Sequence, residues 1–397
     1  MAWCRVLLLA CSVLASGLVV AQQVNTTPLS SVSFMNAKQQ LQLLPAASHY
    51  LMQAQGKTLK VQLSNRLLVK TGLQHNVASL RQLHPAIGKV QQLAKLQQAN
   101  WWLVTVKDNP PTAVLSYLQQ HDQVLAVQPD LLLQRQSAAT VETSGQNKHQ
   151  ALIQPGNTTQ AVRLAIIDDG FDLQHPALQG LNIALQYDAD LRVADASPKL
   201  PLDQHGTQVA AVLVQTTRQY GVEPELVLIR QVSSWTSDLV LGFSVARMMQ
   251  ADIVNSSWVL SFLPDPLAEL LNEWQQQHAY FVFAAGNNAV DACSSNAFSQ
   301  LPGALLVAAA KHDGQLWPYS NYGTCVDIKA PAYFQLNSSA KNQSAPFTGT
   351  SAAAAYVSAM LAVKLASGIH PNPDHLQNLL VPEHSKAAET NLHSSDQ

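Results

Sequence analysis

The sequence lacks runs of basic residues and carries little charge of either sign. Of its 397 residues, 23 are Lys or Arg and 25 are Asp or Glu, so only 12% are charged and the formal net charge is −2. Proteins that bind nucleic acids cluster positive charge against the phosphates. We therefore expect no nucleic-acid partner. The 47% of hydrophobic residues are enough for at least one sizeable core.

Long apolar stretches are also scarce. One runs from Val6 to Val20 behind the single charge of Arg5, and the small residue Ala21 precedes Gln22. This pattern is typical of an export signal, and the stretch is too short for a stable membrane span. We expect residues 1–21 to be a signal peptide and the protein to be exported, either secreted or periplasmic.

Cysteine is rare, with four residues in the whole chain. Cys4 and Cys11 lie in the predicted signal peptide, so export leaves only Cys293 and Cys325. An even pair in an oxidising compartment predicts a disulfide. Two buried free thiols are the alternative.

Residues 22–140 differ in hydrophobic patterning from the chain that follows them. Within them, residues 57–135 predict a compact α+β unit, whereas residues 22–56 show no readable pattern. The polar stretch 136–150 predicts a linker. The elements expected in the compact unit are strands at 66–70, 101–106 and 124–130 and helices at 77–93 and 110–121.

Residues 141–382 predict a larger α/β domain, and residues 383–397 a polar tail. Short, continuously apolar runs alternate with helical segments, which indicates a doubly wound, mostly parallel sheet with helices on both faces. Functional sites in such domains lie beyond the carboxyl ends of the strands. The expected strands are 162–168, 226–232, 251–258, 280–286 and 304–310, and the expected helices begin near His205, at a Ser237 cap and at Pro266.

Four polar residues stand where these strands end or helices begin. Asp168 ends the first strand, and Asn287 follows another. His205 starts a helix, and Ser351 opens an alanine-rich helix. Each has a simple structural explanation as a turn or cap residue. Together they are the parts of an activated serine: a carboxylate, an imidazole base, a hydroxyl nucleophile and an amide that can bind an oxyanion.

At these residues the sequence resembles the subtilisin-like serine proteases, with features of the proteinase K-like branch. "LAIIDDGFDLQHPAL", "HGTQVAA", "FAAGNN" and "GTSAAAA" resemble the family's aspartate, histidine, oxyanion and serine motifs, in the family's chain order. The resemblance implies a serine endopeptidase with Asp168, His205 and Ser351 as the catalytic triad and Asn287 in the oxyanion hole. It also implies a disulfide between Cys293 and Cys325. An α/β-hydrolase esterase is excluded, because Ser351 lacks a G-x-S-x-G elbow and the triad order differs.

The resemblance gives the segment before the α/β domain a role. Residues 22–140 are expected to be a propeptide that assists folding and then acts as an intramolecular inhibitor. The protein would be a self-processing zymogen, cut within residues 136–150, and a monomer that acts on polypeptides. The alternative is a catalytically weak or inactive binding protein on the same fold.

The family's substrate groove maps onto two short segments. Ser257-Trp258-Val259 would pair with an extended peptide, and these residues with Ala284-Ala285-Gly286 would line the primary pocket. Neither segment contains an acidic residue, which favours apolar substrate side chains over Lys or Arg. Val259 replaces a usual glycine and should narrow the groove.

No cofactor is expected to be required. The family often binds calcium through an Asp in "HPDL", but this chain reads "HPAL", with Ala177. Residues 214–222 contain no Asp or Asn. We therefore expect the family's tight calcium site to be absent and assign no metal ligands, which leaves open a weaker calcium site elsewhere.

Overall fold

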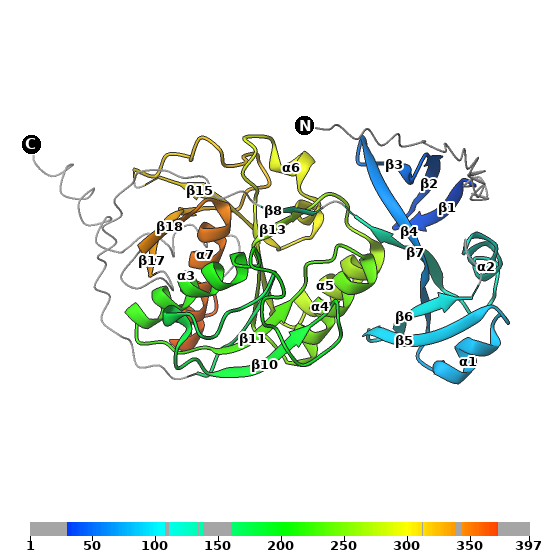
Figure 1. Cartoon of the computed structure of the whole chain (residues 1–397), viewed down its shortest axis with the longest axis horizontal. Helices are drawn as coiled ribbons and strands as arrows, with labels where there is room; N and C mark the ends of the chain where they lie inside the picture. Colours follow the sequence, from blue (N-terminus) through cyan, green and yellow to red (C-terminus); the bar gives the residue numbers. More distant parts are fainter. Residues whose placement is uncertain are drawn as a thin grey trace, which may run out of the picture.

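The computed structural model describes two units that lie side by side (Figure 1). The described residues are 30–107, 111–133, 135–137, 160–311, 313–337 and 344–371. The predicted signal peptide and polar tail, and residues 138–150 of the predicted linker, lie outside these ranges. Within the ranges, no helix has the length and apolar character needed to cross a membrane.

The larger unit is built on a seven-stranded parallel sheet. Its strand order is β10-β11-β9-β12-β14-β15-β16, and every neighbouring pair is parallel. The doubly wound α/β architecture predicted from the alternating apolar runs is confirmed. The strands are β9 (Arg163–Asp168), β10 (Ile183–Asp188), β11 (Glu225–Arg230), β12 (Ile253–Ser256), β14 (Tyr280–Ala284), β15 (Leu305–Ala310) and β16 (Ile328–Pro331).

Helices cover both faces of this sheet, which is why its strands are apolar throughout. Along β9, Leu164 and Ile166 pack with α3 (His205–Gln219) and α7 (Thr350–Ala366). The intervening Ala165 and Ile167 pack with α4 (Thr236–Met248) and α5 (Asp265–Gln275). Because α7 is buried along nearly its whole length, its small residues allow it to lie directly against the sheet.

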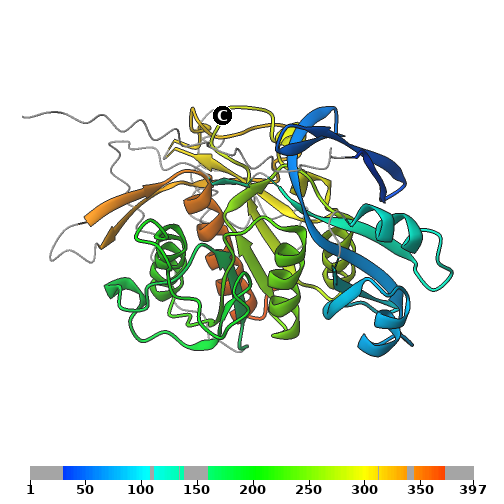
Figure 2. The same cartoon turned by 45° about the vertical axis from the view of Figure 1, so that its right-hand side comes forward.

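The N-terminal unit contains another seven-stranded sheet, whose strand pairs are antiparallel, and two short helices. In Figure 2 its long strand β4, in blue, runs from the first three strands to the opposite end of the unit. β4 pairs with β3 in its first half and with β6 in its second half, while β7 lies along it. The elements are β1 (Val32–Asn36), β2 (Gln39–Ala46), β3 (His49–Ala54), β4 (Lys57–Gly72), β5 (Ile87–Lys95), β6 (Ala99–Val106), β7 (Ala126–Leu132), α1 (Val77–Gln82) and α2 (Thr112–Leu118).

The helix predicted over residues 77–93 is wrong in its second half. Helix α1 ends at Gln82, before Pro85, which disfavours a helical conformation in the residue before it and cannot donate a hydrogen bond. Residues 87–95 form β5 instead. Two irregularities in its pairing with β6 space the buried Ile87, Val90 and Leu93 three residues apart, as in a helix.

The N-terminal unit docks on the amino-terminal ends of α4 and α5. Asp130 of β7, which is fully buried, accepts hydrogen bonds from the backbone nitrogen (2.9 Å) and Oγ (3.0 Å) of Ser237. Asn36 Oδ1 accepts a bond from the backbone nitrogen of Asp265 (2.8 Å), and Ala37 donates its backbone N–H to the Asp265 carboxylate. Ser237 is therefore inside α4 rather than its cap, and the Asp130 carboxyl group accepts hydrogen bonds offered by the first turn of the helix.

A short strand of the N-terminal segment reaches the larger unit. β8 (Arg135–Ser137) pairs antiparallel with β13 (Trp258–Leu260), placing Gln136 opposite Val259 and Ser137 opposite Trp258 (Figure 1). The linker predicted over 136–150 thus begins inside a strand. Its polar composition did not reveal this pairing, because the partner strand is about 120 residues away in sequence.

A disulfide joins Cys293 and Cys325, with a Cα–Cα distance of 5.4 Å and a sequence separation of 32. Replacing both cysteines by serine should lower the free energy of unfolding by about 3–4 kcal/mol, because the cross-link restricts the unfolded chain. Denaturant unfolding of oxidised wild type beside the double variant measures this difference. A loss below about 1 kcal/mol would contradict the expectation.

Candidate active site

The predicted triad carboxylate and imidazole meet at the carboxyl end of the central strand. Asp168 is the last residue of β9 and His205 the first residue of α3. Asp168 Oδ1 lies 2.8 Å from His205 Nδ1 and also accepts the backbone N–H of Asp169 at 2.8 Å. Asp168 is 1% exposed, so this contact is shielded from water. The geometry fixes the Nδ1 side of the imidazole on the carboxylate and leaves Nε2 on the opposite side of the ring.

Glycine at position 206 allows α3 to approach β9 this closely. A Cβ there would lie 2.9 Å from Asp168 Cβ and 2.5 Å from the carbonyl oxygen of Gly170, which is closer than real side chains come. The ring of His205 packs edge-on against Phe347, at 5.6 Å between centroids. The imidazole is therefore held both by its carboxylate and by the segment that leads to Ser351.

Asp169 supports the same histidine, a role that the sequence analysis did not assign. Its carboxylate accepts the backbone N–H groups of His205 (3.2 Å) and Gly206 (2.7 Å). It thereby caps α3 from another element. Burial, and then the neighbouring charge of Asp168, raise the pKa of Asp169. The Asp-Asp pair in the sequence was the available signal, but a turn explains the pair equally well.

Asn287 follows β14 and is oriented by the residue before the predicted nucleophile. Its Oδ1 accepts hydrogen bonds from the backbone nitrogen (3.0 Å) and Oγ1 (2.9 Å) of Thr350. This orientation makes the amide nitrogen, a hydrogen-bond donor, the end of the side chain that would face an oxyanion. Gly349 has φ +90°, and a Cβ there would lie 2.7 Å from Asn287 Nδ2. Gly349 and Thr350 belong to the serine motif, and the structure adds that they contact Asn287.

Ser351 lies in the first turn of α7, against the predicted substrate strand. Its Oγ donates to the carbonyl oxygen of Ser257 (3.2 Å), and Ser257 Oγ donates to the carbonyl oxygen of Ser351 (3.2 Å). The backbone N–H groups of this first turn favour negative charge nearby. The structure therefore brings the predicted nucleophile to the start of the strand expected to bind substrate.

The predicted pocket walls stand beside this serine, but one side chain turns away from them. Trp258 donates from Nε1 to the carbonyl oxygen of Ile167 (3.0 Å) and packs edge-on against Phe298, so only its backbone faces β8. Val259 faces the other wall, since a Cβ on Gly286 would lie 3.1 Å from Val259 Cγ2. Ala284 and Ala285 are buried behind Gly286.

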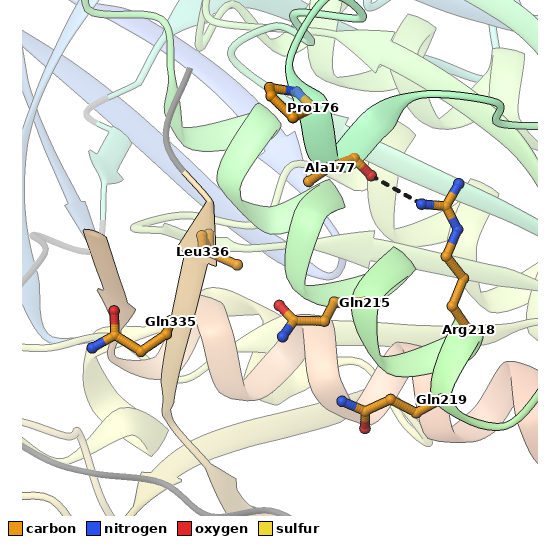
Figure 3. Close-up of a pocket in the computed structure, with 7 residues that line it drawn as sticks. All are labelled: Pro176, Ala177, Gln215, Arg218, Gln219, Gln335 and Leu336. Atoms are coloured by element: carbon orange, nitrogen blue, oxygen red, sulfur yellow. Dashed lines mark hydrogen bonds between the residues drawn. The ribbon is translucent and has the colours of Figure 1, made fainter. Parts of the chain in front are cut away.

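Ala177 stands where the family often has a calcium-binding aspartate, and its surroundings bear on the predicted lack of a tight calcium site. Ala177 lies on a cavity of about 440 Å³ (Figure 3). The described residues that line it include no carboxylate: Pro176, Ala177, Gln215, Arg218, Gln219, Gln335 and Leu336. The Arg218 guanidinium donates to the carbonyl oxygens of Gln179 (2.6 Å) and Ala177 (3.4 Å). A guanidinium on these carbonyls would compete with a calcium ion for them, so the absence of the tight calcium site stays a prediction.

Among the residues that the structure describes, one group of three potential metal ligands lies away from this cavity. Asp291, Cys293 and Cys325 lie close together, but both sulfurs are joined in the disulfide and cannot bind a metal as thiolates.

Comparisons with known proteins point to one family. A model of the subtilase family matches residues 159–395. A thermophilic serine proteinase of Bacillus sp. (strain AK1) is 28% identical over 217 residues, which cover 52% of this chain and 52% of that protein. A subtilase-type proteinase of Schizosaccharomyces pombe is 24% identical over 294 residues, covering 68% of this chain and 64% of that one. The chain thus spans about half to two thirds of the length of these relatives.

A solved structure shows the same fold. Fervidolysin from Fervidobacterium pennivorans, described as a keratinolytic enzyme related to subtilisin, superposes with a TM-score of 0.60 and 16% identity. The match covers 78% of this chain and 56% of fervidolysin.

The calcium argument predicts that a chelator leaves thermal stability unchanged. Excess EDTA should not shift the melting temperature of the purified full chain, whereas Arg218→Ala should lower the free energy of unfolding by about 1 kcal/mol. Thermal and denaturant unfolding measure the two effects. A melting temperature that falls with EDTA and recovers with added calcium would show that a metal site exists.

Proposed function

Because the chain belongs to the subtilase family, we propose that it is a serine endopeptidase whose nucleophile is Ser351. The observation that carries the proposal is the 2.8 Å contact between buried Asp168 Oδ1 and His205 Nδ1. It joins two motifs 37 residues apart at the edge of the sheet where α7 presents Ser351. A carboxylate in this position holds the imidazole in the tautomer that can accept a proton at Nε2.

The proposed reaction proceeds in two halves. Ser351 Oγ attacks the substrate carbonyl carbon and passes its proton to His205 Nε2, while Asp168 stabilises the imidazolium. Asn287 Nδ2 and the backbone N–H of Ser351 bind the resulting oxyanion. The leaving amine takes the proton from His205, which gives an acyl-enzyme. Water then repeats the sequence and releases the carboxylate product.

The pairing of β8 with β13 supports the proposed way in which peptides bind. An extended chain lies antiparallel to Trp258–Leu260, and Ser257 at the start of this segment contacts Ser351. Main-chain hydrogen bonds in such a pairing do not depend on substrate side chains. Polypeptides, added as one strand at this edge, are therefore the proposed substrates.

The same pairing supports a zymogen. The N-terminal unit docks on α4 and α5, and its last described strand, β8, lies where a substrate would bind. We propose that residues 22–140 are a propeptide which the enzyme itself removes and which inhibits it until released. The predicted signal peptide and the disulfide favour export, to the periplasm or beyond. Nothing in the proposed mechanism needs a second subunit or a cofactor.

Ser351→Ala should abolish self-processing and lower peptidase activity by at least about 10⁴-fold, because the nucleophile is lost. The intact mass of the exported product, wild type beside variant, measures processing. Ser367→Ala, at the other end of α7, is the matched control and should be processed normally. Identical cutting of wild type and Ser351→Ala would contradict self-processing. Failure of mature protein to react with a fluorophosphonate probe would favour the inactive binding protein.

The docked N-terminal unit should bind more weakly as the pH rises from about 4 to about 7. Burial raises the pKa of Asp130 to about 6, despite Arg66, with Asp238 adding to the rise. Burial also raises the pKa of Asp265 to about 6; Glu269 adds to this rise, and the Ala37 N–H and Lys70 oppose it. Release into water returns the pKa of both carboxyl groups towards about 3.9. Between about pH 4 and pH 7 the docked state therefore holds more protons than the released state, and a rise in pH weakens docking.

Gel filtration of the cleaved protein at pH 5 and pH 7.5 measures this dependence as the fraction of N-terminal unit retained. Linkage limits the effect to about tenfold in the dissociation constant per pH unit for each proton. Asp265→Asn should reduce the dependence to the part that Asp130 contributes, because an amide does not titrate. Retention that increases with pH would show that other groups control release.

A further inference from the structure

The gap between the two walls beside Ser351 is closed by one side chain. Val259 is 3% exposed, and its Cγ2 would lie 3.1 Å from a Cβ built on Gly286 of the opposite wall. One methyl group therefore spans the slot from β13 to the segment that precedes Asn287. Glycine at position 259 would leave this slot open.

The opposite wall is held in place and cannot swing away from the valine. Gly286 donates its N–H to Thr350 Oγ1 (3.1 Å) and accepts the backbone N–H of Asn321 (2.8 Å). Asn321 Nδ2 also donates to the carbonyl oxygen of Ala285 (2.9 Å). The β-branched Val259 has few rotamers in a strand. A large substrate side chain would therefore need to displace a fixed wall.

The register of β8 places the substrate residue that meets this valine. Gln136 lies opposite Val259 and Ser137 opposite Trp258, so a peptide bound in this register brings its next residue opposite Ser257. Ser257 contacts Ser351, so the carbonyl of that residue is the one attacked. Opposed residues of an antiparallel pair share a face, and Ser257 and Val259, two apart, share it as well. The side chain at the cleaved bond thus points to the slot that Val259 fills.

We infer that Val259 restricts the site to small side chains, such as Gly, Ala or Ser, on the acyl side of the cleaved bond. This inference rests on the proposed peptidase function and narrows the broader apolar preference expected from the sequence. It also selects one bond for self-processing. The residue after Ser137 is Ala138, outside the described residues, and Ala139 follows. Hydrolysis would break the bond from the Ala138 carbonyl carbon to the Ala139 nitrogen, leaving a carboxylate on Ala138 and a new amino terminus at Ala139.

The test uses the full chain, with residue 138 as the reporter. Intact mass over time follows the product that begins at Ala139. Ala138→Phe should slow this cleavage about 100-fold, because the phenyl ring has no space beside Val259. Ala138→Ser is the matched control and should be cut at about the wild-type rate.

A second substitution reopens the slot. Val259→Gly combined with Ala138→Phe should recover the cleavage at least about tenfold over Ala138→Phe alone. Val259→Ala, which keeps a side chain in the strand, provides the same test if the glycine variant does not fold. Val259→Thr keeps the shape of valine and should not rescue Ala138→Phe.

The outcomes separate the inference from the proposed function. If Ser351→Ala blocks processing but Ala138→Phe is cut between 138 and 139 at the wild-type rate, the enzyme is a self-processing protease and the inference is wrong. Absence of rescue by both Val259→Gly and Val259→Ala would also overturn it. If wild type and Ser351→Ala yield the same products, the proposed self-processing fails first, and the inference fails with it.

Discussion

The site depends on how closely helices α3 and α7 lie against the central sheet. Helix α7 is buried along nearly its whole length, and its first turn consists of Thr, Ser and a run of Ala. Larger side chains would push the helix away from β12 and β14, because interiors are packed without spare volume. The same constraint applies at Gly206 and Gly349, where a single Cβ would collide with Asp168 or Asn287. Close packing therefore sets the distances on which the proposed proton transfer depends.

The four site residues could be predicted because each belongs to a local motif. Their types and chain order required only the alternation of strands and helices, which brings strand ends to one edge. The residues that orient them were less visible. Asp169 acts through backbone N–H groups 36 and 37 positions away, and Thr350 acts through Asn287. Such contacts depend on tertiary packing, which neither amino-acid composition nor hydrophobic periodicity reveals.

The structure of the N-terminal unit was harder to predict from the sequence than the site. Its strands β1 to β3 gave no readable pattern, although their side chains alternate between buried and exposed positions. Exposed apolar residues such as Met35 and Leu44 stand between the buried ones and hide this alternation in the sequence. The spacing of buried residues in β5 imitated a helix because of two irregularities in its pairing. Pro85 was visible in the sequence and carried more information than the period around it. Over so short a segment, a proline that interrupts helices is stronger evidence than the spacing of apolar residues.

Two of the contacts between the N-terminal unit and the larger unit differ in their response to pH. The β8–β13 pairing uses backbone hydrogen bonds, which do not titrate. The contacts at α4 and α5 bury carboxyl groups, Asp130 and Asp265, whose ionisation opposes docking. In the proposed processing, cleavage would remove the covalent link between the strand in the groove and the larger unit, so retention of the N-terminal unit would then depend more on the contacts at α4 and α5. A groove that accepts small residues favours the chain's own Ser-Ala-Ala sequence, while the buried carboxyls limit how long the product stays.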